Sequence, residues 1–399
     1  MIEPKLRFKA DDGSQFPDWE EKTFNDVADY KKGPFGSALK KEIFVPKSND
    51  TVKVYEQQNA ISKDWKLERY FVTNEYFQSK MKSFAVSGGD IIVSCAGTIG
   101  EMYELPHDAE EGIINQALMR VRIKKSVINS MIFRCVFDKM ISTEGVKISN
   151  GSALKNIPPF ADMKKQSVFV PSLPEQQKIA EFLSTIDTVI EKQKETVSAW
   201  EERKKGVMQK LFSQEVRFKA DDGSDFPEWE EKKLGECCDI LDSKRKPISK
   251  ENRVLGKYAY YGSTNIQDYI NEYLFDEPLV LLAEDAGPFD DFWNKAIAQF
   301  ATGKFWVNNH AHVLRPHENR KYFFYSLEHR DIRVYINNPS RGKLNQEDMV
   351  KIPMYIPCLA EQQKIADCLS SLDEVIEKQK ATLAAWEELK KGLLQQMFV

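Results

Sequence analysis

A stretch of 40 residues occurs twice in the chain, and it constrains the fold more than any other feature. The copies are residues 173–212 and 359–398. In both, apolar residues recur at alternating steps of four and three, with Glu and Lys beside them, which is typical of a coiled-coil seam. Each copy therefore predicts one long helix. The seam positions that we single out are Ile179, Leu183, Ile186, Ile190, Gln193, Trp200, Ile365, Leu369, Leu372, Ile376, Gln379 and Trp386.

The two predicted helices are expected to pack on each other. A single amphipathic helix could equally pack on its own domain, but two near-identical copies in one chain favour pairing. Because helix one connects the two modules and helix two follows the second module, helices that lie side by side must run antiparallel. Gln193 and Gln379 then fall together at the midpoints, where a polar pair fixes the register at some cost in stability.

A second repeat, of turn-rich composition, precedes each module at residues 7–22 and 217–232. The order leader, module, long helix therefore occurs twice, which predicts a duplicated, pseudo-twofold α+β protein. It would have two mixed α/β modules separated by an antiparallel coiled coil. The predicted boundaries are 1–172 for the first leader and module, 173–212 for helix one, 213–358 for the second leader and module, and 359–399 for helix two.

Both modules alternate short β-type runs with turns. The runs fall at 52–62, 70–74, 89–105, 113–123, 257–265, 278–287, 295–316 and 351–357. One helix is expected in each module, at 130–141 and near 321–328. The modules otherwise share little sequence. A conserved frame with divergent modules suggests one scaffold that carries two different readers.

Composition sets the broad class of the protein. No apolar run reaches membrane-spanning length and no signal peptide opens the chain. The six cysteines contain no C-x-x-C pair, which indicates reduced thiols and a cytoplasmic location. The net charge is −4, but residues 23–172 hold 21 basic and 17 acidic residues. That mildly basic first module permits nucleic-acid binding without establishing it.

Catalytic and metal motifs are weak. Neither G-x-G-x-x-G nor the P-loop pattern occurs. Residues 156–160 approach the Asn-Pro-Pro-Phe signature of adenine methyltransferases, but Ile157 interrupts it and no glycine-rich cofactor site accompanies it. His310 and His312 would share one face of a strand, with Asp290–Asp291 upstream, but no further ligands stand at a characteristic spacing. We therefore predict no catalytic residue and no metal site.

Several polar, glycine-containing loops suit a nucleic-acid reader. Lysine and arginine contact phosphates, glycine lets backbone N–H groups approach them, and Gln, Asn and Arg can pair with base edges. Taken singly, each loop reads more simply as a solvated turn, yet a Gly-Lys-Asn loop precedes both long helices. The candidates are Lys31, Lys32, Gly36, Ser37, Gln57, Gln58, Asn59, Gly151, Ser152, Lys155, Asn156, Lys244, Arg245, Lys246, Tyr261, Ser263, Asn265, Arg341, Lys343 and Asn345.

Along its whole length the chain resembles the specificity subunits of type I restriction–modification systems. The most specific motifs are Glu175–Gln177 and Glu361–Gln363, which open the two helices. Shorter matching stretches are 33–37, 261–263 and 303–305. Ala360 replaces the usual proline of the second helix entry, which removes a favourable first-turn residue.

The resemblance implies two target recognition domains that each read half of a split double-stranded DNA sequence. The conserved helices would set the gap between the halves. It also implies a subunit without catalytic residues or bound cofactors. Two methylation subunits and two restriction subunits would supply the S-adenosylmethionine, ATP and Mg chemistry. No membrane partner is expected.

Two other classes of function remain open at the level of sequence. A self-sufficient adenine methyltransferase would bind S-adenosylmethionine by itself. A coiled-coil scaffold would show no salt-dependent binding to DNA.

Overall fold

The chain folds into two compact units that divide its long helices between them. The residues that the computed structural model describes are 4–148 (backbone alone for 144–148), 160–337 and 342–398. Unit 1 comprises residues 1–192 and 384–399, and unit 2 comprises residues 193–383. Each unit therefore holds one module and parts of both helices. No helix in the described ranges is long and apolar enough to cross a membrane.

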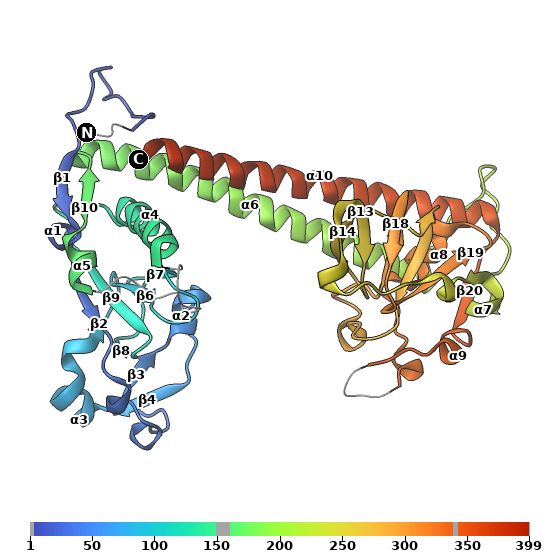
Figure 1. Ribbon diagram of the computed structural model, residues 1–399, viewed down its shortest axis with the longest axis horizontal. Coiled ribbons are helices and arrows are strands. Elements are labelled where there is room, and N and C mark those ends of the chain that lie inside the picture. The colour runs from blue at the N-terminus through green and yellow to red at the C-terminus, as the bar shows by residue number, and fades with distance from the viewer. Residues whose placement is uncertain (1–3, 149–159, 338–341, 399) are drawn as a thin grey trace. The chain divides into compact units, whose positions relative to one another are not determined.

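Among its described residues, unit 1 contains two four-stranded sheets and a two-stranded ribbon, and Figure 1 labels all of their strands except β5. The first sheet has the order β2 (Ala28–Lys32), β9 (Leu118–Ile123), β6 (Ile91–Ser94) and β7 (Met102–Glu104). The second has the order β4 (Tyr70–Thr73), β3 (Thr51–Tyr55), β8 (Gly112–Ile114) and β5 (Ala85–Val86). The ribbon pairs β1 (Glu20–Thr23) with β10 (Ser167–Val170).

Unit 2 repeats this topology strand for strand, although the modules share little sequence. Its first sheet has the order β12 (Cys238–Ile240), β19 (Ala311–Pro316), β16 (Leu279–Ala283) and β17 (Ala298–Ala301). The second has the order β14 (Ile266–Ile270), β13 (Leu255–Tyr261), β18 (Lys304–Val307) and β15 (Phe275–Asp276). β11 (Glu230–Lys233) pairs with β20 (Pro353–Ile356). Among the described strands, one pair in each unit is parallel, β3 with β8 or β13 with β18, and the other pairs are antiparallel.

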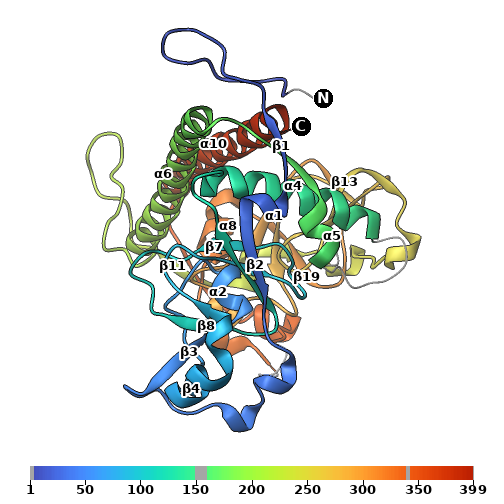
Figure 2. The same cartoon turned by 90° about the vertical axis from the view of Figure 1, so that its left-hand side faces the viewer.

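The layers of unit 1 follow from the burial of its central strand. All four residues of β6 are buried, because the sheet is covered on both faces. One face packs on α4 (Ser130–Ile148) through Phe133 and Phe137, and the same core includes Ile179 and Leu183 of the first long helix. The other face packs on the second sheet. Figure 2 shows α4 in this position, between the long helices and the strands.

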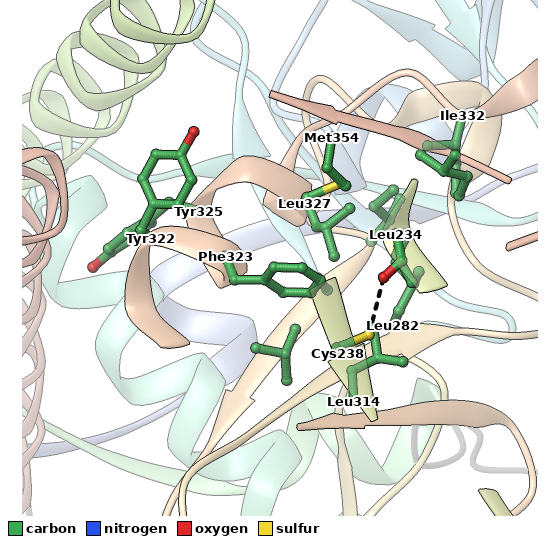
Figure 3. Close-up of a cluster of buried hydrophobic side chains, with 14 of the residues drawn as sticks. Leu234, Cys238, Leu282, Leu314, Tyr322, Phe323, Tyr325, Leu327, Ile332 and Met354 are labelled. Atoms are coloured by element: carbon green, nitrogen blue, oxygen red, sulfur yellow. Dashed lines mark hydrogen bonds between the residues drawn. The ribbon is translucent and has the colours of Figure 1, made fainter. Parts of the chain in front are cut away.

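The core of unit 2 is built in the same way around α8 (Arg320–Glu328). Phe323 and Leu327 of α8 pack in one cluster with Leu282 and Leu314 of the first sheet, as Figure 3 shows. The Cys238 thiol lies in this cluster and donates a hydrogen bond to the Leu234 carbonyl oxygen at 3.4 Å. All six cysteines of the chain are free thiols.

The two repeated stretches form the long helices α6 (Leu173–Phe212) and α10 (Leu359–Met397), as predicted. Within each unit, the start of one helix packs against the end of the other, so the pairing is antiparallel. Unit 1 joins Ile179 to Met397 in one core, and unit 2 joins Ile365 to Leu211. Most of the aliphatic seam positions are buried: Ile179, Leu183, Ile186, Ile190, Ile365, Leu369 and Ile376. The half-buried positions are Gln193, Trp200, Leu372, Gln379 and Trp386.

The polar pair in the seam forms the expected contact. The Gln193 side-chain amide donates to the Gln379 side-chain oxygen at 2.7 Å and to its backbone oxygen at 3.0 Å. Each amide therefore finds a partner at a position where an apolar residue would otherwise stand.

The leaders are clasped to the helix entries by buried charge. Glu175 has no exposed surface, and it receives hydrogen bonds from the Arg7 guanidinium at 2.9 and 3.1 Å. The Trp19 ring nitrogen also donates to Glu175, at 3.2 Å. In unit 2, Arg217 and Trp229 bind Glu361 in the same arrangement: the hydrogen bonds there are Arg217–Glu361 at 2.8 and 3.1 Å and Trp229–Glu361 at 3.0 Å.

The following glutamine fastens the module to the same helix turn. The Gln176 side-chain oxygen accepts from the Asn129 backbone N–H at 2.7 Å, and its amide nitrogen donates to the Val127 carbonyl at 2.9 Å. Gln362 accepts from the Asn319 N–H at 3.3 Å in unit 2. The Glu-Gln signature is therefore a structural joint between leader, module and helix.

Some expected elements differ in detail. The β-type run 52–62 ends as a strand at Tyr55, and residues Gln57–Ile61 form the short helix α2. The cause is the side chain of Asn59, whose oxygen accepts from the Glu56 N–H at 2.8 Å and caps the turn. The helix expected at 130–141 continues to Ile148.

Candidate nucleic-acid interface

The loops that carry most of the predicted contact residues meet at one edge of each module. β2 and β6 both run antiparallel to β9, so they end at the edge where β9 begins. β3 and β8 are parallel and end there too, because the 115–117 turn joins β8 to β9. The Cys95 N–H donates to the Ala117 carbonyl at 2.8 Å, and the Gly33 N–H donates to the Leu118 carbonyl at 2.8 Å. We call this the loop edge.

The loop edge of unit 1 gathers the predicted residues of the first module. Those that the structure places there are Lys31, Lys32, Gly36, Ser37, Gln57, Gln58 and Asn59. Lys32, Gly36, Ser37 and Gln58 are exposed. The Lys31 ammonium instead lies 4.6 Å from the centre of the Phe84 ring.

Asn59 differs from its neighbours because it is only 2% exposed. Its amide nitrogen donates to the Asp64 and Leu67 carbonyls at 3.0 and 2.9 Å, in addition to the cap that its oxygen forms. These bonds use its polar atoms inside the module. The structure therefore gives Asn59 a scaffolding role, in contrast to the expected base contact.

The loop edge of unit 2 holds the corresponding set: Lys244, Arg245, Lys246, Tyr261, Ser263, Asn265, Lys343 and Asn345. Lys244, Lys246 and Asn265 are exposed. The Ser263 hydroxyl donates to the Asp285 carbonyl at 2.6 Å, which joins the loop after β13 to the loop after β16. Asn345 occupies the N-cap position of α9 (Gln346–Met349), where its side chain makes no capping hydrogen bond.

Arg245 is held by carboxylates and is less accessible than its sequence context suggests. Its guanidinium lies 2.5 Å from Glu284 and 3.3 Å from Asp242. Lys343 also approaches Glu284, at 3.4 Å, and is 49% exposed along its side chain. Arg245 therefore stiffens the loop edge, whereas Lys343 keeps a side chain that can reach a phosphate.

The two histidines considered as metal ligands have separate partners. His312 contacts Asp242 at 2.5 Å and the Leu344 carbonyl at 2.9 Å. His310 contacts Asp285 at 2.7 Å. Ligand atoms of Asp242, Glu284 and His312 lie within 4.8 Å of one another, but the Arg245 guanidinium already pairs with both carboxylates. The geometry is that of an internal ion-pair network.

Five predicted contacts lie outside the described residues: Gly151, Ser152, Lys155, Asn156 and Arg341. The methyltransferase-like stretch falls mostly there as well, and Phe160 begins α5 (Phe160–Lys165).

Sequence reasoning missed the loops that follow β6 and β16. Residues 95–101 and 284–288 stand at the two loop edges, and Gly97 and Ala286 adopt positive φ angles of 66° and 50°. The signal that could have found them is their place after a wholly buried strand. Burial raises the pKa of the Cys95 thiol in this loop to about 12, so the thiol stays protonated.

Comparisons with known proteins show which family the chain belongs to. A family profile described as the type I restriction modification DNA specificity domain matches residues 17–198 and 227–385, once in each repeat. A putative type I restriction enzyme specificity subunit from Haemophilus influenzae is 37% identical over 147 residues, which are 36% of this chain and 37% of that protein. The MjaVIII specificity subunit from Methanocaldococcus jannaschii is 22% identical over 437 aligned positions, covering 97% of this chain and 94% of that protein.

Solved structures show the same fold. The S subunit of a type I restriction–modification system from M. genitalium superposes with a TM-score of 0.53 at 17% identity, over 100% of this chain and 99% of that one. A chain from a study of complex assembly in the type I R-M system gives 0.54 at 16% identity, over 96% and 98%. With a profile that covers both repeats, the chain belongs to the family of type I restriction–modification DNA specificity subunits.

Proposed function

We propose that the chain is the DNA-reading subunit of a type I restriction–modification complex, and that each loop edge reads one half of a bipartite target. The long helices set the spacer between the halves and provide the docking surface for two methylation subunits. Two restriction subunits complete the assembly, which acts in the cytoplasm.

One observation carries the proposal. Two modules of identical topology stand on a repeated frame, yet their loop edges present different chemistry. Unit 1 offers exposed Lys32, Ser37 and Gln58, whereas unit 2 offers Lys244, Lys246 and Asn265 around an internal acidic network. Equal scaffolds with unequal contact surfaces are what two independent base readers require.

The subunit is proposed to be non-catalytic. The motifs of the loop edges suit phosphate and base contacts, and the Cys95 thiol is held protonated. Methylation with S-adenosylmethionine and cleavage with ATP and Mg then belong to the partner subunits. Tight binding of S-adenosylmethionine by this chain alone would contradict this division and favour a self-sufficient methyltransferase.

Module exchange tests the proposal directly. Residues 233–358 are replaced by the second variable module of a relative, and methylated adenines are mapped in cells that carry the complete system. We expect one half of the methylated motif to change and the other to stay. A motif in which both halves change would contradict independent reading.

Helix insertion tests the spacer. A 40-residue helix such as α6 spans roughly 60 Å at about 1.5 Å per residue. Four residues added after both Thr196 and Thr382 lengthen each helix by about 6 Å with only about 40° of excess rotation. Since a base pair advances about 3.4 Å, the spacer should grow by one or two base pairs with both half-sites unchanged. An unchanged spacer in an assembled variant would mean that the helices do not set it.

Phosphate contact by residues that precede the long helices in the sequence is testable at Lys155 and Lys343. Alanine at either position should weaken binding to all sequences and lower the salt slope by roughly one unit. An unaltered salt dependence would leave them as ordinary surface lysines.

A further inference from the structure

The loop edge of unit 1 displays an apolar ring that the fold does not use. Phe35 is 89% exposed, although it stands between the exposed Lys32 and the turn Gly36–Ala38. The comparably exposed large apolar side chains are Val334 at 87% and Leu255 at 83%, both in unit 2. Single exposed apolar side chains are ordinary on protein surfaces, so what distinguishes Phe35 is its place at the loop edge among the predicted DNA contacts.

The backbone on both sides of Phe35 is fixed. The Gly33 N–H donates to the Leu118 carbonyl at 2.8 Å, and a Cβ atom at Gly33 would lie 1.8 Å from the Asn115 carbonyl oxygen. This close approach explains the glycine. On the other side, the Ala38 N–H donates to the Phe35 carbonyl at 2.9 Å, and the Tyr76 hydroxyl donates to the Ala38 carbonyl at 2.7 Å. The exposure of the ring is therefore set by an anchored loop.

The surroundings of the ring are basic. Lys32, Lys40 and Lys41 are exposed within six residues of Phe35 along the chain. Cations around an apolar ring fit a partner whose charged groups flank apolar faces, and duplex DNA has this chemistry in its phosphates and bases. The corresponding loop of unit 2, residues 241–248, contains no aromatic residue.

We propose that Phe35 is a specificity-determining residue, whose ring packs against the bases of the half-site read by unit 1 while the neighbouring lysines bind phosphates. This inference rests on the proposed function. Because the contact is apolar, it should discriminate between sequences without contributing to the salt dependence of binding.

The test compares Phe35→Ala and Phe35→Leu with two controls in the complex assembled with its methylation subunits. Methylation mapping of the wild type supplies the cognate duplex, and a second duplex has the unit 1 half-site scrambled. Phe35→Ala should reduce the cognate preference by about tenfold or more at an unchanged salt slope, and Phe35→Leu by less. In cells, the base requirement should relax in one half-site only.

The controls separate the apolar contact from general effects. Lys32→Ala should weaken binding to both duplexes alike and lower the salt slope. Leu255→Ala removes a similarly exposed apolar side chain away from the loop edge, so it should leave the cognate preference unchanged. Because Phe35 makes little contact within the fold, both of its variants should keep the wild-type melting temperature.

The outcomes distinguish the two proposals. A wild-type complex that shows no preference between the duplexes would overturn the proposed function itself. A wild type that discriminates, together with a Phe35→Ala variant of equal preference, would overturn only the role of Phe35.

Discussion

The same lysine of the repeated helix has different surroundings in the two units. In unit 2, the side chain of Lys204 is 10% exposed, and it binds Glu328 of α8 at 2.8 Å and the 37% exposed Asp373 of α10 at 2.7 Å. The Tyr325 hydroxyl completes the group by donating to Asp373 at 2.6 Å. In unit 1, the equivalent Lys390 pairs with Asp187, at 31% and 37% exposure.

The difference comes from the module helix and not from the frame. α8 presents Tyr325 and Glu328 to the lysine, where α4 has Cys135 and Asp138 at the matching positions. The frame thus supplies a Lys–Asp pair in both units, with the aspartate equally exposed in each, and the module decides how deeply the lysine is buried. The same lysine of the repeat is therefore expected to contribute differently to stability in the two units.

The largest expected effect follows from removing the buried cation. Lys204→Met leaves the buried Glu328 carboxylate without its partner, which should destabilise unit 2 by about 3 kcal/mol, because Asp373 of the same group is 37% exposed and loses less. The matched change Lys390→Met should cost only about 0.2–1 kcal/mol, because its pair is partly solvated. Hydrogen exchange measured by mass spectrometry over peptides of each unit reports both values. Equal losses in the two units would refute the contrast.

The ion pairs that hold the leaders, Arg7–Glu175 and Arg217–Glu361, should instead contribute equally to the stability of the two units. Arg7 and Arg217 have side-chain exposures of 19% and 20% and bind glutamates of 0% exposure. Alanine at either position should cost about 2 kcal/mol, because a charged hydrogen bond is lost while the acceptor stays buried. Chemical denaturation checks this, with Arg333→Ala, which removes an exposed local pair, as the near-neutral control. A large difference between the two clasps would show that the frame is not equivalent.

The smallest expected effect is a pH dependence at Asp138. Its side chain reaches solvent, but desolvation by neighbouring atoms, with Glu101 nearby, raises the pKa of the carboxyl. The folded state therefore binds the proton more tightly than the unfolded chain, whose Asp pKa is about 3.9. Stability should fall as the pH rises above about 4, until the folded pKa is passed.

Replacing this carboxyl should remove that dependence. Asp138→Asn is expected to gain roughly a few tenths of a kcal/mol at pH 7 and nothing at pH 3, since solvent screens the effect. Glu328→Gln at the matching position of unit 2 should instead destabilise, because it weakens a buried ion pair. Melting temperatures between pH 3 and pH 8 test both signs, and a neutral-pH loss for Asp138→Asn would contradict the argument.

The frame was predictable from the sequence, because its signals are local and repeated. The periodic stretches predicted both long helices, and the polar seam positions predicted the Gln193–Gln379 contact. The chain order alone required antiparallel pairing. The prediction of turn-rich leaders was also correct: Gly13 and Gly223 adopt φ angles of 85° and 86°.

The internal structure of the modules was much harder to predict from the sequence. Their common topology depends on pairings between distant strands, such as β3 with β8, for which no local pattern exists. Asn59 was predicted as a DNA contact, because no local pattern shows that its amide nitrogen binds carbonyls five and eight residues away inside the module. The acidic partners of Arg245 stand up to 39 residues from it, so sequence could not show that its charge is already satisfied.

The first leader also lies against the end of helix α10, so the two ends of the described chain are close together. The Val216 N–H donates to the Lys210 carbonyl at 3.2 Å where helix α6 continues into the second leader. The equivalent Leu6 N–H donates to the Gln396 carbonyl at the same distance, without a covalent connection between them. A short linker from Phe398 to Pro4 would close the backbone into a ring of two like halves. Opening that ring between Ser213 and Glu215 then gives a circular permutant that should keep both units, with their order along the chain reversed.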